Sequence, residues 1–391
     1  MDSTNEKYSA AATATATLTT AQQPEVAALQ AQHKRHRIDE FDIARGFAII
    51  AVVVGHLNGT GIPIKLVDFC FSFHMPLFFI VSGYFMKPDV RLDDAYVRKN
   101  ARSLLVPYLL TSLFVVILGP LESLASGQPV GEAARRMATL ALAALYGSGD
   151  NLNGMPDMVI AIGAIWFLLA LFWARIFLAA ANMTRCPGAI VLVLFIASYM
   201  MDGDLLWLPF SIQAGMGATL FLYVGKKIHE LGLLERGTIH PMLWLAIAVT
   251  WAYSILFGGK LYMVSGHYGD GLLDVVGSIC GTMCLIVFAR VLKEHARPIA
   301  EPLRRLGTIT LPVFCMHLVE LDVFPWGYAI IRIDALGLPV PMWVCLLVAH
   351  FALIAVMTTV LWCLPRPISG VFFPSRRRRK APLGAHDAAV R

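Results

Sequence analysis

Two ionisable side chains lie in one apolar segment, DIARGFAIIAVVVGH, and their spacing indicates that they act together. Arg45 and His56 are eleven residues apart, which in an α-helix is a rise of about 16 Å and about 20° beyond three full turns. They therefore share one helix face. Ionisable groups inside a membrane span are costly and are functional candidates. The arrangement suits a long ligand whose anionic end contacts Arg45. Structural roles also stay open, because Arg45 could extend to the headgroups and His56 could bond a neighbouring helix.

The next apolar segment, SFHMPLFFIVSGYF, contributes His74 and Ser82. Pro76 removes a backbone donor, so we expect a kink in this helix. If the segment crosses the membrane in the opposite direction, His74 reaches a depth similar to that of His56, and both imidazoles could face one cavity. Helix packing is the alternative role for His74, and the Ser82-Gly83 pair is typical of close helix approach.

Two later segments supply the remaining candidates for a substrate pocket. Trp166 begins AIWFLLALF, and the segment LGTITLPVFCMHLVELD holds His317 and Glu320. Because His317 and Glu320 are three residues apart, they lie on the same side of a helix. The carboxylate could orient a substrate or tune a histidine, although the two side chains could also simply satisfy each other.

The composition decides which elements must position these residues. Of the 391 residues, 57% are hydrophobic and only 15% are charged, whereas about 25% are charged in a typical soluble domain. Because the apolar runs are close to the length that crosses a bilayer, the sequence predicts an all-α, polytopic membrane protein with about ten transmembrane helices. The expected spans are 41–60, 67–86, 103–121, 158–181, 188–201, 205–225, 241–258, 271–292, 308–331 and 341–364.

The distribution of lysine and arginine predicts the orientation of these spans. Ten spans with a cytosolic amino terminus place about 25 of these residues on inner segments and about 5 on outer ones, as expected for cytoplasmic loops. Residues 133–147 are apolar but short, and we expect an interfacial or re-entrant helix there. An additional span at this point would reverse everything after it.

We expect three regions along the chain, in a multi-pass protein of the plasma membrane with both termini cytosolic. Residues 1–37 are expected to form a disordered tail, because an Ala/Thr/Gln-rich segment buries too little apolar area to fold. Residues 38–364 form the membrane domain, and 365–391 form a basic tail after the last span.

Several classes of function lack support in the sequence. The net charge of +6 comes from short clusters between apolar runs, so nucleic acid is not expected as a partner. The cysteines lie mostly in apolar runs, and Cys280 and Cys284 have only His267 nearby, so neither a disulfide framework nor a metal site is expected. No phosphate-binding glycine motif of the nucleotide-hydrolysing type occurs.

Together, five motifs resemble those of the transmembrane acyltransferase family 3, and specifically its fucose 4-O-acetylase-like branch. They are DIARGFAIIAVVVGH, SFHMPLFFIVSGYF, RKNARSLLVPYL, AIWFLLALF and LGTITLPVFCMH. The last departs from the usual pattern, with Thr310 in place of serine and Val313-Phe314 in place of Ile-Tyr. The resemblance covers about residues 38–362.

The resemblance implies ten transmembrane helices, acyl-CoA used from the cytosolic side, and O-acylation of a sugar or glycan precursor. Acetyl-CoA would be a co-substrate, with no tightly bound cofactor. A thioester donor of this kind needs a cation for its phosphates, a role that suits Arg45. The acceptor hydroxyl needs a general base, a role that suits His56.

Two other functions stay open at this point. A proton-coupled transporter would also place titratable groups within the membrane, although it would usually show paired repeats with broken helices. A partner that moves acyl groups without choosing an acceptor would keep both Arg45 and His56.

Overall fold

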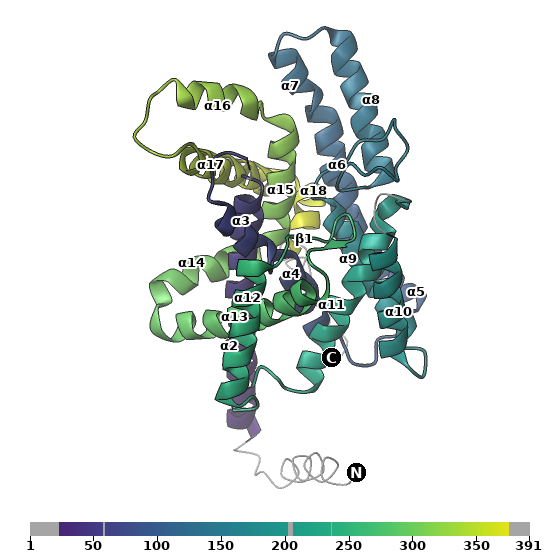
Figure 1. Ribbon diagram of the computed structural model, residues 1–391, viewed down its shortest axis with the longest axis vertical. Coiled ribbons are helices and arrows are strands. Elements are labelled where there is room, and N and C mark those ends of the chain that lie inside the picture. The colour runs from purple at the N-terminus through teal and green to yellow at the C-terminus, as the bar shows by residue number, and fades with distance from the viewer. Residues whose placement is uncertain (1–22, 58, 202–205, 236, 375–391) are drawn as a thin grey trace, which may run out of the picture.

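The computed structural model describes residues 23–57, 59–201, 206–235 and 237–374 (Figure 1). It is 73% helical with almost no sheet, which confirms the all-α class. The first half contains α2 (Gln23–Gly55), α3 (Ile64–Phe71), α4 (His74–Tyr84), α5 (Asp94–Asn100), the π-helical turn η1 (Ala101–Leu105), α6 (Val106–Leu118), α7 (Pro120–Ala125), α8 (Val130–Tyr146), α9 (Trp166–Ala181) and α10 (Pro187–Met200). The second half contains the 3₁₀ turn η2 (Pro209–Ser211), α11 (Ile212–Glu230), α12 (Pro241–Phe257), α13 (Leu272–His295), α14 (Arg297–Thr308), α15 (Thr310–Val323), α16 (Trp326–Asp334), α17 (Met342–Cys363) and α18 (Arg366–Phe372). Strands β1 (Leu261–Tyr262) and β2 (His267–Tyr268) form one antiparallel hairpin between α12 and α13.

Fewer helices than expected meet the requirements for crossing a membrane. Within the described ranges, four are long and apolar enough: Ile64–Tyr84, Asp94–Ala125, Leu272–His295 and Met342–Cys363. A fifth arises if Arg297–Thr308 and Thr310–Val323, which are bent by 74°, count as one span. The ten predicted spans are therefore not shown. Part of the difference is length, because α9, α10 and α12 are apolar helices of only 14 to 17 residues.

The helical backbone extends beyond the predicted membrane domain at both ends. Helix α2 begins at Gln23, so it includes part of the predicted tail; residues 1–22 lie outside the described ranges. The segment 23–37 contains three alanines, three glutamines and two arginines, residue types that favour helices. At the other end, α18 occupies the start of the predicted basic tail, and Phe372 and Phe373 are buried. Burial of these aromatic side chains stabilises the fold because it removes apolar surface from water.

The segment 133–147 forms a helix, as the sequence predicts. It corresponds to α8, a 17-residue helix that packs against α6 and α7 at one end of the molecule (Figure 1). This helix is not among those long and apolar enough to span, and its interfacial or re-entrant placement stays a prediction.

Helix α2 packs against α14 through glycines at the crossing point. A Cβ atom on Gly46 would lie 2.2 Å from the carbonyl oxygen of Leu303, and one on Gly307 would lie 1.7 Å from that of Asp42. Both distances are far inside van der Waals contact, so only glycine permits this approach. Helix α13 also packs against α2, and further contacts to α2 come from α3, α4, α15 and α17.

Helices α4 and α11 meet in a similar way. A Cβ atom on Gly83 would lie 1.9 Å from the carbonyl oxygen of Leu222, and one on Gly225 would lie 2.0 Å from that of Ile80. Gly83 therefore has the close-packing role that the sequence indicates. The chain between α3 and α4 is interrupted at residues 72–73, three residues before Pro76, where the proline predicts a break.

Ion pairs group the predicted inner segments together and the predicted outer segments together. Lys65 and Lys260 both approach the carboxylate of Asp68, at 3.4 and 4.0 Å. Lys293 lies 3.1 Å from the carboxylate of Asp39, close to the bidentate pair of Arg290 with Glu40. Because α13 runs between these two groups, they lie near opposite ends of that helix. Which end faces the cytosol stays a prediction.

Candidate functional site

His56 directly follows the last residue of α2. Its Nδ1 lies 2.8 Å from the carbonyl oxygen of Val52, one turn earlier, and its side chain is exposed. A carbonyl oxygen can only accept a hydrogen bond, so Nδ1 carries the proton and donates it. The tautomer is assigned from this partner, and it leaves Nε2 as the nitrogen with a free lone pair.

His317 on α15 connects His56 to a buried carboxylate. The Nε2 of His317 lies 3.3 Å from the Nδ1 of His56, and its Nδ1 lies 2.8 Å from Oε1 of Glu320. Both His317 and Glu320 are fully buried. The prediction that these two residues lie on the same side of one helix is confirmed.

His350 on α17 completes the cluster, although it was not among the candidate residues predicted from the sequence. Its Nδ1 lies 2.7 Å from the same oxygen, Glu320 Oε1, and its ring stacks on that of Trp326 with centroids 3.7 Å apart. An imidazole within the apolar segment MWVCLLVAHFALIAV is the signal that could have found it, since ionisable groups are rare in such segments.

The four residues form one hydrogen-bonded chain with a defined direction. We call His56, His317, Glu320 and His350 the histidine cluster. The carboxylate accepts from Nδ1–H of both His317 and His350, so Nε2 of His317 is left to accept from Nδ1–H of His56. The cluster thus orients His56 and can stabilise the positive charge that forms when its Nε2 takes up a proton.

The buried part of the cluster also has the composition of a metal site. Donor atoms of His317, Glu320 and His350 all lie within 4.8 Å of one another. The second carboxylate oxygen, Glu320 Oε2, is buried and has no hydrogen-bond partner in the described part of the chain. The N···O distances of 2.7 and 2.8 Å are those of hydrogen bonds, and the absence of a metal site stays a prediction.

A cavity of about 800 Å³ lies between α4, α5, η1, α9 and the beginning of α15. This volume is within the usual range for ligand pockets. Arg45 lines it together with Thr310, Leu311 and Phe314 of α15. His56 also faces α15, through its contact with His317. Arg45 and His56 therefore lie on the same side of α2, as their spacing predicts.

Arg45 forms one ion pair and still has a hydrogen-bond donor without a partner among the described residues. It forms an ion pair with Asp42, one turn earlier in α2, and its side chain is 30% exposed. Its Nε is buried without a hydrogen-bond partner among the described residues. The side chain can therefore still donate to a ligand in the cavity.

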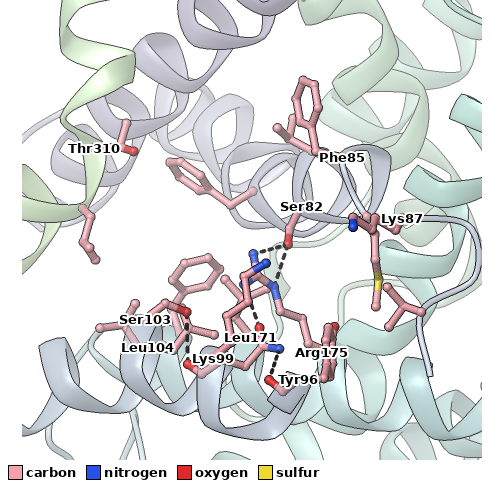
Figure 2. A pocket seen from close by; sticks show the side chains of 18 of the residues that line it. Ser82, Phe85, Lys87, Tyr96, Lys99, Ser103, Leu104, Leu171, Arg175 and Thr310 are labelled. Carbon is pink, nitrogen blue, oxygen red and sulfur yellow. Dashed lines mark hydrogen bonds between the residues drawn. The ribbon is translucent and has the colours of Figure 1, made fainter. Parts of the chain in front are cut away.

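Ser82 also lines the cavity, where it contacts an arginine from another helix. Its hydroxyl oxygen accepts from Nε and Nη2 of Arg175, at 3.1 and 2.8 Å, as Figure 2 shows. Arg175 falls within the predicted span 158–181 and was not among the candidate residues. A lone arginine in an apolar span was again the available signal.

The cavity extends toward the histidine cluster. Phe314, which lines the cavity, precedes His317 of the cluster by one helical turn. The rings of Phe78, Phe167 and Phe314 follow one another with centroid separations of 5.7 Å, and all three line the cavity. This end of the cavity is therefore apolar, whereas the other end is cationic.

The structure places His74 and Trp166 outside these two features. His74 is buried, with Nδ1 2.6 Å from the carbonyl oxygen of Cys70, and it is not hydrogen-bonded to the histidine cluster within the described ranges. Trp166 packs against Phe167 and beside Gly149, and it does not line the cavity.

Comparison with known proteins gives the class of the protein. The acyltransferase 3 domain family matches residues 38–362, which is most of the chain, and the protein belongs to this family. It is a membrane acyltransferase, and this membership favours acyl transfer over proton-coupled transport. No curated protein and no solved structure matches the chain. The family match does not distinguish branches, so the fucose 4-O-acetylase-like assignment stays a prediction.

Proposed function

We propose that this membrane acyltransferase transfers an acyl group, acetyl in the simplest case, from cytosolic acyl-CoA to a hydroxyl group of a sugar or cell-surface glycan precursor. The proposal includes membership of the fucose 4-O-acetylase-like branch, a location in the plasma membrane with both termini cytosolic, and no tightly bound cofactor. The proposal rests on the family assignment, on the proton transfer that the histidine cluster can support, and on the cavity that can bind a donor.

The observation that carries the proposal is the orientation of His56. Its Nδ1–H is directed to the oxygen of Val52 and to Nε2 of His317, and its side chain is exposed. Nε2 is then an accessible base held in one tautomer. A hydroxyl group is a poor nucleophile until its proton is removed, and a positioned imidazole is the commonest group for this task.

The proposed step balances without a further reactant. The acceptor hydroxyl gives its proton to Nε2 of His56 as its oxygen attacks the thioester carbonyl carbon. The carbon–sulfur bond then breaks, and the leaving thiolate takes the proton back from the imidazolium. In between, the positive charge on His56 is stabilised through His317 by the carboxylate of Glu320.

The cavity has the properties expected of a site for the donor. Five cationic side chains line it against two acidic ones, and its far end is apolar and aromatic. A nucleotide carrying phosphates fits the first part, and an extended thioester arm fits the second. Arg45 is the cation on α2 itself, about 16 Å along the helix from His56.

The test is acyl transfer by purified protein carrying His56→Ala. General-base catalysis contributes roughly 10²- to 10⁴-fold, so we expect kcat to fall by about that factor with little effect on expression. His295→Ala is the matched control, because His295 is an exposed histidine at the end of α13 whose Nδ1 also contacts a carbonyl one turn earlier, at 3.0 Å.

Activity of His56→Ala above a tenth of wild type would contradict the assignment of the base. Transfer or hydrolysis of the acyl group of acetyl-CoA by the purified wild-type protein tests the donor. Comparison of glycan acetyl content between a deletion strain and its parent tests the acceptor, and an unchanged glycan would contradict the proposed acceptor class.

A further inference from the structure

Arg175 lies in the wall of the cavity with only neutral partners. Its Nε and Nη2 donate to the hydroxyl of Ser82 (Figure 2), and its Nη1 donates to Oδ1 of Asn100 at 3.0 Å. In the part of the chain that the structure describes, no carboxylate lies within ion-pair distance of it. A guanidinium that is largely removed from water normally pairs with an anion, so a missing anionic partner points to a ligand.

The contacts of Arg175 hold its guanidinium in one orientation. Ser82 comes from α4, Asn100 from the end of α5, and Arg175 from α9. Asn100 is 3% exposed, and its Nδ2 donates to the carbonyl oxygen of Tyr96 at 2.9 Å, which turns its Oδ1 toward Arg175. The remaining N–H groups of Arg175 have no partner among the described residues. A preorganised arginine of this kind can bind a planar set of oxygens at two points.

The charges around Arg175 favour an anion with more than one negative charge. Lys87, Arg91 and Lys99 line the same cavity as Arg175, and Figure 2 labels Lys87 and Lys99 in its wall. Asp89 and Asp93 oppose them, but Asp93 already accepts from the backbone N–H of Tyr96 at 2.6 Å as the cap of α5. The cations are therefore in excess on this side.

Arg45 is a weaker candidate for the main contact with such an anion. Its charge is already opposed by Asp42 in an ion pair, whereas that of Arg175 is opposed by no carboxylate in the described ranges. A ligand phosphate would thus gain more from Arg175, because no resident anion has to be displaced or repelled.

We propose that Arg175, oriented by Ser82 and Asn100, binds a phosphate group of the coenzyme A part of the donor. The identity of the donor rests on the proposed function. The assignment gives Ser82 a positioning role, because its hydroxyl orients Arg175, in addition to the helix-packing role expected for the Ser82-Gly83 pair. Helices α4, α5 and α9 then form the part of the site that binds the donor. Helices α2 and α15 connect this part to His56.

The test measures equilibrium binding of coenzyme A by calorimetry, using the full-length protein in phosphatidylcholine nanodiscs. Losing a charge-assisted hydrogen bond should weaken binding about 10- to 150-fold in Arg175→Ala. Arg175→Lys should recover only part of the affinity, because lysine lacks the planar fork. Ser82→Ala should weaken binding less than Arg175→Ala does. Arg135→Ala is the control, because Arg135 is exposed on α8 and pairs with Glu132. The affinity of this variant for coenzyme A should equal that of wild type.

A second probe, 3′-dephospho-coenzyme A, locates the phosphate. If Arg175 contacts the 3′-phosphate, wild type and Arg175→Ala should bind this probe equally. If it contacts the diphosphate, the difference between them should persist. Both results support a phosphate contact. Thermal unfolding in the same nanodiscs identifies a variant that has lost its fold, and in that case Ser82→Ala and Arg175→Lys decide the question.

Three results would overturn the inference. Equal affinity of wild type and Arg175→Ala for coenzyme A would remove Arg175 from the donor site while leaving the donor assignment intact. A lipid phosphate as the true ligand would appear as unchanged coenzyme A affinity with loss of phosphatidylglycerol binding in Arg175→Ala. No binding of coenzyme A by the wild-type protein would overturn the proposed donor itself, and the inference with it.

Discussion

His317 Nε2 lies 3.3 Å from His56 Nδ1, although the two residues are 261 positions apart in the chain. This contact joins an exposed imidazole at the end of α2 to a buried carboxylate on α15, because His317 also donates to Glu320. The exposed ring can meet a substrate, while the buried residues fix its tautomer and oppose its charge. The separation of roles gives distinct expectations for substitutions at each position.

Glu320→Gln should lower kcat by at least tenfold and by less than the roughly 10²- to 10⁴-fold expected for loss of the base itself. The amide keeps the size of the side chain but removes the negative charge that stabilises the proton on His317 and the charge on His56. The Michaelis constant for the donor should stay unchanged, because the cavity is untouched. Asp322→Asn, two residues further along α15, is the control. A raised donor constant with normal kcat would contradict the role of Glu320.

His350→Phe separates the hydrogen bond of His350 from its packing. Phenylalanine can still stack on Trp326 but cannot donate to Glu320 Oε1. We expect kcat to fall by about tenfold, since losing a hydrogen bond to a charged group is worth about 1.5–3 kcal/mol and only part of this loss reaches His56. Thermal unfolding should change little. A large loss of stability with normal kcat would make His350 a packing residue only.

Arg45→Lys should raise the apparent Michaelis constant for the acyl donor but not for the acceptor. Lysine can keep the ion pair with Asp42, yet it lacks the second donor of the guanidinium fork. Arg45→Ala should have the larger effect, provided that chemistry is slow relative to donor dissociation. Donor and acceptor titrations on membranes measure both constants. A shift confined to the acceptor curve would move Arg45 to the acceptor side, and no shift would make it a structural anchor.

Gly83→Ala should destabilise the protein, because the new Cβ would lie 1.9 Å from a backbone oxygen of α11. Forcing extra volume into a packed interface costs typically about 1–3 kcal/mol. Thermal unfolding in detergent or nanodiscs should show a lower Tm. Gly131→Ala is the matched control, since a Cβ at Gly131 on α8 meets nothing within 4 Å and alanine is the better helix former. An equal Tm for both variants would contradict the close approach of α4 and α11.

Single cysteines should reveal which end of the molecule faces the cytosol. A membrane-impermeant thiol reagent added to intact cells should label a cysteine at position 65 or 260, which the structure places around one carboxylate, Asp68. Cysteines at positions 98 and 293 should react only after the membrane is opened, because the distribution of positive charge places them inside. Labelling at 293 in intact cells would mean that 133–147 crosses the membrane after all.

The sequence by itself determined the features that depend on local periodicity and composition. The helical class follows from apolar runs that must satisfy their own backbone hydrogen bonds in a bilayer. The common face of Arg45 and His56, and that of His317 and Glu320, follows from the rise and turn of a single helix. These relationships hold whatever the neighbouring helices are. The sequence predicted ten spans, but only four or five helices of the described residues are long and apolar enough to cross a membrane. An apolar run does not fix the length of the helix within it, and α9, α10 and α12 are short.

Only the tertiary structure decided which helices face one another. His350 enters the cluster because α17 packs against α15, and no spacing within either helix indicates that contact. Arg175 meets Ser82 and Asn100 across 93 and 75 positions, which joins α9 to α4 and α5. The glycines at 46, 83, 225 and 307 permit the close crossings that fix these neighbours, but a glycine in a sequence does not name the backbone it will approach. Helix pairing depends on the fit of whole surfaces, and that fit becomes visible only when the chain is folded.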